Sequence, residues 1–89
     1  MSLSENWVLR IDPDVYKALK KIPRQYADVI LGAIRLLPAN PYFGDTQKIK
    51  GENDAWRRRI GSYRLFYKII KETKIILVFR LERRGSKTY

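Results

Sequence analysis

The chain has 89 residues, no cysteine and no histidine, and 19 basic against 9 acidic residues, which gives a net charge of +10. This length fits one domain rather than two, so we expect a single domain over residues 1–89. Thiol nucleophiles, histidine bases and the usual zinc ligands are excluded, and any catalysis must use Lys, Arg, Tyr, Ser or carboxylates. Hydrophobic residues make up 45% of the chain, which is enough to form a folded core.

The charge is concentrated in the second half of the chain. Residues 1–44 carry six basic and four acidic residues (+2), whereas residues 45–89 carry thirteen and five (+8). Such an excess indicates a polyanionic partner, which could be nucleic acid, an acidic protein or an anionic membrane surface. The alternative is that the basic residues only keep the protein soluble, but solubility does not require them to cluster in one half of the chain. No apolar run is long enough to span a bilayer and no signal peptide is recognisable, so we expect a soluble cytoplasmic protein.

The first half of the chain predicts a strand followed by two helices. Residues 1–6 are polar and expected to be disordered, and residues 7–11 are rich in strand formers. Asp12 and Pro13 then suit the cap and the first position of a helix, and Pro23 starts a second helix after a very short connection. The apolar positions at helical spacing are Val15, Leu19 and Ile22 in the first helix, and Tyr26, Ile30, Ala33, Ile34 and Leu37 in the second.

The second half predicts a sheet. Residues 38–44 contain two prolines and a glycine and therefore form a loop. Residues 55–60, 63–70 and 74–81 are rich in β-branched and aromatic residues, and the short connections between them imply antiparallel hairpins. The sequence thus predicts an α+β fold of order β-α-α-β-β-β. In this fold a helical hairpin packs on one face of a mostly antiparallel twisted sheet.

Alternation of side chains sorts the predicted strands into two faces. Alternation puts the charged Arg58 with Trp56 and Ile60 on a core face, which does not suit a charged side chain. We therefore expect Arg58 to lie at a sheet edge or to reach toward water. The other face carries Arg57, Arg59, Arg64 and Arg80. The face expected to pack under the helices consists of Tyr63, Leu65, Tyr67 and Ile69, together with Ile75, Leu77, Phe79 and Leu81.

A basic groove with aromatic residues at its rim suits single-stranded nucleic acid, because phosphates meet the cations while bases stack on rings. The alternative is that these arginines pair with local acids or face solvent, although nine acids cannot neutralise nineteen bases. The residues expected to contact RNA are Arg57, Arg59, Arg80, Arg84 and Lys87.

Three features of the second half of the chain occur together: Lys48-Ile49-Lys50-Gly51, the run from Trp56 to Tyr67 (WRRRIGSYRLFY) and a basic tail that ends in Tyr89. They resemble the RelE/ParE superfamily of toxins from type II toxin–antitoxin systems, and the resemblance extends from Trp7 to Tyr89. For the RelE-like branch it implies an mRNA interferase, a metal-independent endoribonuclease that needs no cofactor. Such an enzyme cleaves mRNA on the translating ribosome and so inhibits translation. It also implies a cognate antitoxin with an acidic or amphipathic segment, and no membrane partner.

The resemblance also implies roles for five residues. Lys48 and Lys50 would act as base and phosphate contact, since a lysine amine can accept a proton when nearby cations lower its pKa. Arg64 would brace the scissile phosphate, Arg83 would assist the leaving group, and Tyr89 would stack on or orient the substrate nucleotide. In the RelE-like branch the RNA 2′-hydroxyl attacks the adjacent phosphate, and this reaction needs a base and positive charge.

Two other functions stay open at this stage. Members of the ParE branch resemble this chain in the Tyr63-Arg64 strand motif, yet they poison DNA gyrase by protein contact and are not nucleases. A degenerate, inactive toxin or a plain binding module is the other alternative. It is relevant that Leu81-Glu82 stands where the family often has Gly-His, because Glu82 brings a negative charge beside the site.

Overall fold

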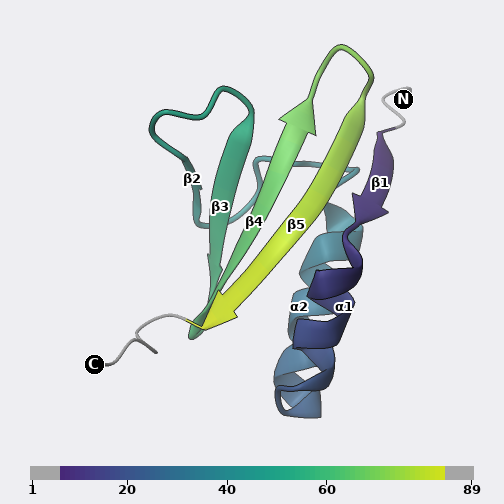
Figure 1. Ribbon diagram of the computed structural model, residues 1–89, viewed down its shortest axis with the longest axis vertical. Coiled ribbons are helices and arrows are strands. Elements are labelled where there is room, and N and C mark those ends of the chain that lie inside the picture. Colours follow the sequence, from purple (N-terminus) through teal and green to yellow (C-terminus); the bar gives the residue numbers. More distant parts are fainter. Residues whose placement is uncertain (1–6, 84–89) are drawn as a thin grey trace.

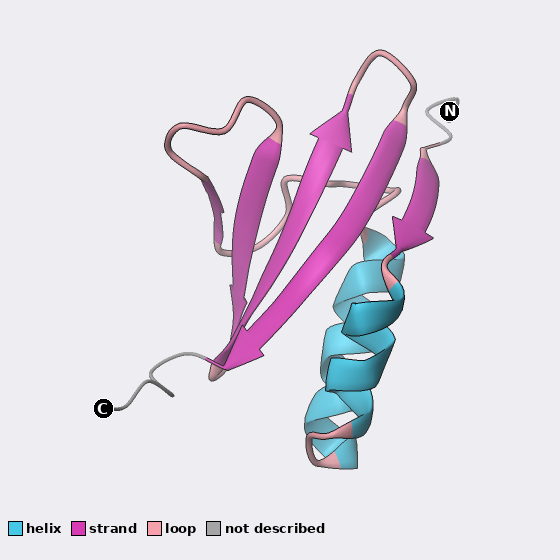
Figure 2. Cartoon of the chain, in the orientation of Figure 1, coloured by secondary structure: helices cyan, strands magenta, loops and turns pink. Residues whose placement is uncertain are grey.

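Two helices cover one face of a five-stranded sheet in the computed structural model, which describes residues 7–83 (Figure 1, Figure 2). The strand order is β1-β5-β4-β3-β2, with β1 parallel to β5 and every other pair antiparallel. This arrangement confirms the predicted α+β class, while the expected disorder of residues 1–6 falls outside the described residues. The elements are β1 (Val8–Ile11), α1 (Pro13–Lys20), α2 (Arg24–Leu36), β2 (Thr46–Lys48), β3 (Ala55–Ile60), β4 (Tyr63–Ile70) and β5 (Ile75–Arg83).

The helices begin where the sequence places their start signals. The Asp12 carboxylate accepts a hydrogen bond from the backbone N–H of Asp14 at 2.8 Å, and Pro13 occupies the first turn of α1. Pro23 directly precedes α2 and fixes the tight connection between the helices. No helix within residues 7–83 has the length and apolar character needed to cross a membrane.

The sequence does not predict strand β2, which adds a fourth antiparallel strand at the edge of the sheet. Thr46 lies opposite Arg58, Gln47 opposite Arg57, and Lys48 opposite Trp56. A strand of three residues is too short to show a two-residue alternation, and its conformation is set by pairing with β3. Lys48 therefore lies in a strand and not in the expected loop.

The core depends on the alternation of β4, as the sequence predicts. Its four residues on the helix side are at most 7% exposed, while the residues between them are half-buried. These side chains meet the apolar stripes of both helices, so burial of apolar area on this one face supplies most of the packing energy. The buried core comprises Val15, Leu19, Ile30, Ile34, Leu37, Tyr63, Leu65, Tyr67, Ile69, Ile76 and Val78.

Strand β5 faces the other way from the sequence prediction over most of its length. Ile76 and Val78 are buried under the helices, whereas Leu77 and Phe79 are half-buried on the opposite face. Both faces of this strand are apolar, so apolarity alone does not reveal which one the helices cover. Only Leu81 joins the core as predicted, because a β-bulge near Phe79 shifts the register by one residue.

Arg58 is held under the loop that joins α2 to β2. Its guanidinium lies 5.0 Å from the centre of the Phe43 ring, and its Nε and Nη1 atoms are buried without a hydrogen-bond partner within residues 7–83. The cation–π contact offsets part of the desolvation of this charge. Beside it the Tyr67 hydroxyl donates to the Pro41 carbonyl at 2.9 Å. Burial raises the pKa of Tyr67, so the hydroxyl keeps its proton and the loop stays tied to the core.

Gly44 allows the loop to pass close to Arg58, which leads to a prediction on stability. Gly44 has a φ of +87°, and a Cβ atom there would lie 2.7 Å from the Arg58 Nε. We expect Gly44→Ala to lower the free energy of unfolding by about 1–2 kcal/mol, since a left-handed backbone is strained for alanine. Urea unfolding of the purified protein measures this change.

Gly32 supplies a matched control for the same substitution. It lies in the middle of α2, and a Cβ atom there would have no neighbour within 4 Å. Gly32→Ala should therefore raise stability by about 0.5–1 kcal/mol through helix propensity. Equal effects of the two substitutions would contradict the role assigned to Gly44.

Candidate functional site

Three arginines gather on the sheet face that the helices leave open. Arg57 and Arg59 of β3 and Arg64 of β4 line one hollow together with Asp45 and Gln47. Arg59 lies directly opposite Arg64 in the β3–β4 pair, and Gln47 lies opposite Arg57 in the β2–β3 pair. Residues opposite one another in a sheet share a face, so strand pairing brings these side chains together. We call Arg57, Arg59 and Arg64 the arginine cluster.

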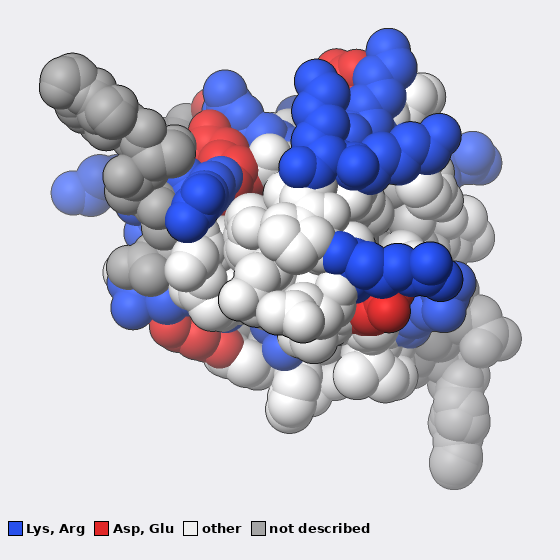
Figure 3. Space-filling view, turned by 90° about the horizontal axis from the view of Figure 1, so that it is seen from below, with Lys and Arg blue, Asp and Glu red and all other residues white. Residues whose placement is uncertain are grey.

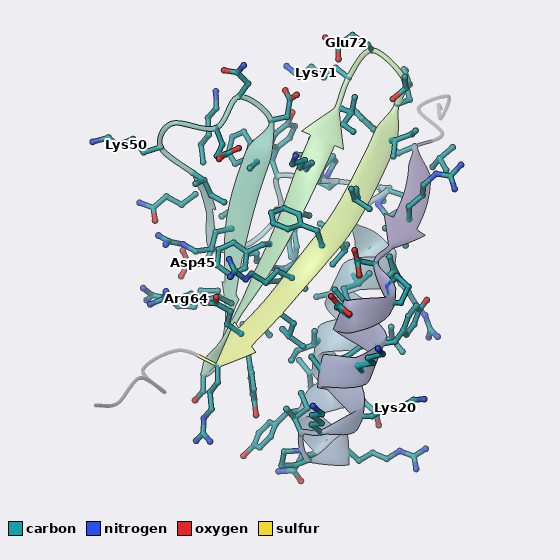
Figure 4. All side chains as sticks on the ribbon, viewed as in Figure 1. Lys20, Asp45, Lys50, Arg64, Lys71 and Glu72 are labelled. Carbon is teal, nitrogen blue, oxygen red and sulfur yellow. The ribbon has the colours of Figure 1, made fainter. Side chains whose placement is uncertain are left out.

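The cluster has few internal partners. Arg57 Nη2 donates to Gln47 Oε1 at 2.6 Å, and Arg59 Nε lies 3.6 Å from Asp45 Oδ2. Both side chains of this ion pair are more than half exposed, so the pair contributes little stability and can be exchanged for another anion. Arg64 forms no ion pair within residues 7–83, and Figure 4 shows it on the same side of the sheet as Asp45. The cluster is therefore open to a negatively charged ligand.

Arg80 and Glu82 lie beside the cluster on the same face. Glu82 is opposite Arg64 in the β4–β5 pair, and Arg80 is opposite Phe66. The Glu82 carboxylate, however, lies 3.2 Å from Arg80 Nε. The negative charge that the sequence places next to the site is thus engaged by Arg80 and leaves Arg64 accessible.

The two lysines of the sequence prediction lie apart from the arginine cluster. Lys48 is opposite Trp56, so its side chain belongs to the helix side of the sheet and not to the face of Arg57. Lys50 lies in the β2–β3 loop and points outward, well away from Arg64 (Figure 4). Strand β2 causes this separation, because an extended chain turns successive residues to opposite faces.

Arg83 also faces away from the cluster. It lies opposite Tyr63 at the end of β5 and lines an apolar pocket with Tyr26 and Val29 of α2. Of the four residues within 7–83 that are expected to act in catalysis, the structure therefore places only Arg64 in the cluster. Tyr89, together with Arg84 and Lys87, lies outside the described residues. Arg57, Arg59 and Arg80 share the open face as the sequence predicts.

Asp45 and Gln47 belong to the hollow but were not singled out by the sequence. Their position follows from strand β2, for which the sequence offers only the preceding Gly44 as a turn signal. Asp45 brings a carboxylate, which can accept a proton, into contact with Arg59. Within residues 7–83 no group of three or more Asp or Glu side chains comes together as a metal site would require.

The arrangement can bind and stabilise a phosphate. A guanidinium presents five donors in a planar fork that matches phosphate oxygens, and several such groups also stabilise charge that develops on phosphorus oxygens. Arginine itself does not lose a proton in proteins, so proton transfer requires another group. Figure 3, which views the molecule from below, shows groups of basic side chains beside an uncharged patch, with acidic side chains interspersed.

Comparison with known proteins gives one family over nearly the whole chain. The family model described as ParE toxin of type II toxin–antitoxin system, parDE, matches residues 9–87. A Methanocaldococcus jannaschii protein named as the toxin RelE1 is 29% identical over 79 residues, which are 85% of this chain and 88% of that protein.

Two solved structures show the same fold. The archaeal RelE–RelB complex of Pyrococcus horikoshii has a chain that is 28% identical, with a TM-score of 0.80 over 92% of this chain and 99% of that one. The isolated E. coli RelE toxin is 18% identical, with a TM-score of 0.75 over 91% and 87% of the two chains.

We expect the arginine cluster to account for binding to single-stranded nucleic acid. Arg64→Gln should weaken binding of a short oligonucleotide and reduce the slope of log affinity against log salt by about 0.7, the value for one lost phosphate contact. Fluorescence anisotropy at several salt concentrations measures both quantities.

Lys20→Gln is the matched control for this experiment. It removes the same charge from the exposed surface of α1, where Figure 4 shows Lys20 far from Arg64. This variant should keep nearly the affinity and slope of the unaltered protein. Equal losses in the two variants would mean that net charge alone, and not the cluster, attracts the nucleic acid.

Proposed function

Because the chain belongs to the RelE/ParE superfamily of toxins from type II toxin–antitoxin systems, we propose that it is an endoribonuclease that cleaves mRNA on the translating ribosome. The observation that carries this proposal is the arginine cluster on the open face of the sheet, with Arg64 free of ion pairs within residues 7–83. The ribosomal target would place its action in the cytoplasm, and the cluster's charge would favour docking onto RNA.

The proposed reaction is transfer within the RNA and consumes no metal or cofactor. The 2′-oxygen attacks the adjacent phosphorus and loses its proton, while the bond from phosphorus to the 5′-oxygen breaks and that oxygen takes a proton from solvent water. The products are a 2′,3′-cyclic phosphate and a 5′-hydroxyl. Arg64, with Arg57 and Arg59, would hold the phosphate and stabilise the additional negative charge of the pentacoordinate transition state.

The proton acceptor of this reaction is assigned to Asp45. Its carboxylate lies in the hollow beside Arg59, whereas Lys48 and Lys50 lie elsewhere. Two roles implied by the family resemblance stay parts of the proposal. Tyr89 would stack on the nucleotide. Arg83, which lies on the helix side at the end of β5, would have to reach around the end of the sheet to assist the leaving group. Arg84 and Lys87 would contact RNA.

An antitoxin is the second proposed partner. The matching Pyrococcus horikoshii chain was solved as a RelE–RelB complex, and its identity to this chain is 28%. An acidic, amphipathic antitoxin segment would suit the open face, because its carboxylates could replace phosphates on the arginine cluster. Binding there would inhibit the toxin by occupying its substrate site.

The match to the ParE family model keeps one other function in view, poisoning of DNA gyrase by protein contact. Expression in growing cells separates the two. We expect prompt arrest of protein synthesis with mRNA cut inside translated codons. Arg64→Ala should abolish both effects, because it removes the guanidinium that would hold the phosphate and that forms no ion pair within residues 7–83. Arrested replication with intact mRNA would refute the nuclease proposal, and Lys20→Ala serves as the control that remains toxic.

The role of Asp45 gives a separate kinetic prediction. Asp45→Asn should lower the rate of cleavage of ribosome-bound mRNA by about 10²–10⁴-fold, the usual contribution of a general base, while RNA affinity stays the same or rises. Single-turnover cleavage measures the rate, and anisotropy measures the affinity. A normal rate in Asp45→Asn combined with a loss in Lys48→Gln would assign the proton to the lysine instead.

A further inference from the structure

The open face of the sheet is ordered in rows that run across the strands. One row across β3, β4 and β5 contains Arg59, Arg64 and Glu82. The neighbouring row contains Arg57, Phe66 and Arg80. Successive rows on one face are two residues apart along a strand, or about 7 Å. The row that contains Phe66, which we call the aromatic row, therefore lies directly beside the row that contains Arg64.

The β-bulge of β5 adds a second ring to the aromatic row. Phe79 and Arg80 follow each other on β5, and both line the open-face groove, because the register shifts between Phe66 and Tyr67. Bulges of this kind redirect side chains, often next to functional sites. The centres of the Phe66 and Phe79 rings lie 6.2 Å apart, with their planes tilted by 51°. Without the bulge, one of these two β5 side chains would have to lie under the helices.

Cations lie against both rings. Arg80 Cζ is 5.6 Å from the centre of the Phe66 ring, and Lys68 Nζ is 5.9 Å from the centre of the Phe79 ring. Both rings remain partly exposed. The groove around them is completed by Ile49 and Glu52 of the β2–β3 loop, by Ala55 and by Leu77. The result is an apolar groove with cations within its lining and the arginine cluster beside it.

We propose that this groove, which we call the aromatic groove, binds a nucleobase of the RNA whose phosphate lies on the arginine cluster. This proposal rests on the proposed function, because that function identifies the bound polyanion as RNA. Phe66 and Phe79 act as the stacking surface, while Arg80 and Lys68 contact the backbone on either side of the base. Stacking of a base on an aromatic ring contributes about 1–3 kcal/mol and tolerates any base.

The chemistry of the groove favours a base over a phosphate or an acidic peptide. Glu52 is the carboxylate in its lining, and it would repel a phosphate or an acidic side chain placed there but can accept a hydrogen bond from a base. Two rings in contact with cations suit the flat, polarisable surface of a base better than an aliphatic side chain. The neighbouring arginines then take the phosphate of the same strand.

A fluorescent base analogue tests this proposal directly. The probe is a short single-stranded RNA with 2′-O-methyl groups, which block cleavage, and with 2-aminopurine at one position at a time. We expect the full-length protein to quench the fluorescence strongly at one position. Phe66→Leu and Phe79→Leu should each remove the quenching and weaken affinity by about 5- to 100-fold. An abasic nucleotide at that position should make these variants bind as the unaltered protein does.

Leucine keeps the groove apolar, so the fold should survive, and Tyr16→Leu on the exposed surface of α1 is the matched control. Unchanged quenching and affinity in both phenylalanine variants would overturn the proposal. So would a loss of binding to an acidic antitoxin segment with RNA binding intact, since the groove would then serve the protein partner. Absence of quenching at every position also overturns it. Failure of mRNA cleavage with position-specific quenching intact would refute the proposed nuclease function alone.

Discussion

Covering the sheet on one face only is the constraint on which the rest of the structure depends. Both helices pack on the side of Tyr63, Leu65, Tyr67 and Ile69, and no charged residue within residues 7–83 is fully buried. Desolvated charges are costly, so Arg57, Arg59, Arg64 and Lys68 of β3 and β4 lie on the uncovered side. Arg58 lies on the helix side and instead rests against the Phe43 ring. The same alternation that builds the core therefore assembles the arginine cluster, and neither can move without the other.

The open face also carries features that weaken the fold. Arg59 lies opposite Arg64, and like charges in directly opposed positions of a sheet are destabilising. Half-buried rings of Phe66 and Phe79 remain on a face without helical cover. Local choices that reduce stability without a structural gain are typical of functional sites. An anionic RNA strand would relieve both, by neutralising the arginines and by covering the rings.

Local patterns were enough to predict most of the fold but only part of the site. The starts of the helices depend on local signals at Asp12, Pro13 and Pro23, and the alternation of β4 identifies its buried face. These predictions are confirmed. Strand β5 is apolar on both faces and contains a bulge, so its orientation depends on pairing with β4. The conformation of strand β2 likewise depends on its pairing with β3. That dependence is why the sequence placed Lys48 near the arginines and missed Asp45.

In the proposed mechanism, one set of residues holds the charge and another residue accepts the proton. A histidine supplies a cation and a base at one position, whereas arginine supplies only the cation. Arg57, Arg59 and Arg64 come from paired strands of a rigid sheet, which suits groups that must be fixed before charge develops. The carboxylate of Asp45 follows Gly44 at the end of a loop, and its pair with Arg59 is exposed at 3.6 Å. In the proposed mechanism an incoming phosphate takes over Arg59, which frees the Asp45 carboxylate to accept the 2′-hydroxyl proton.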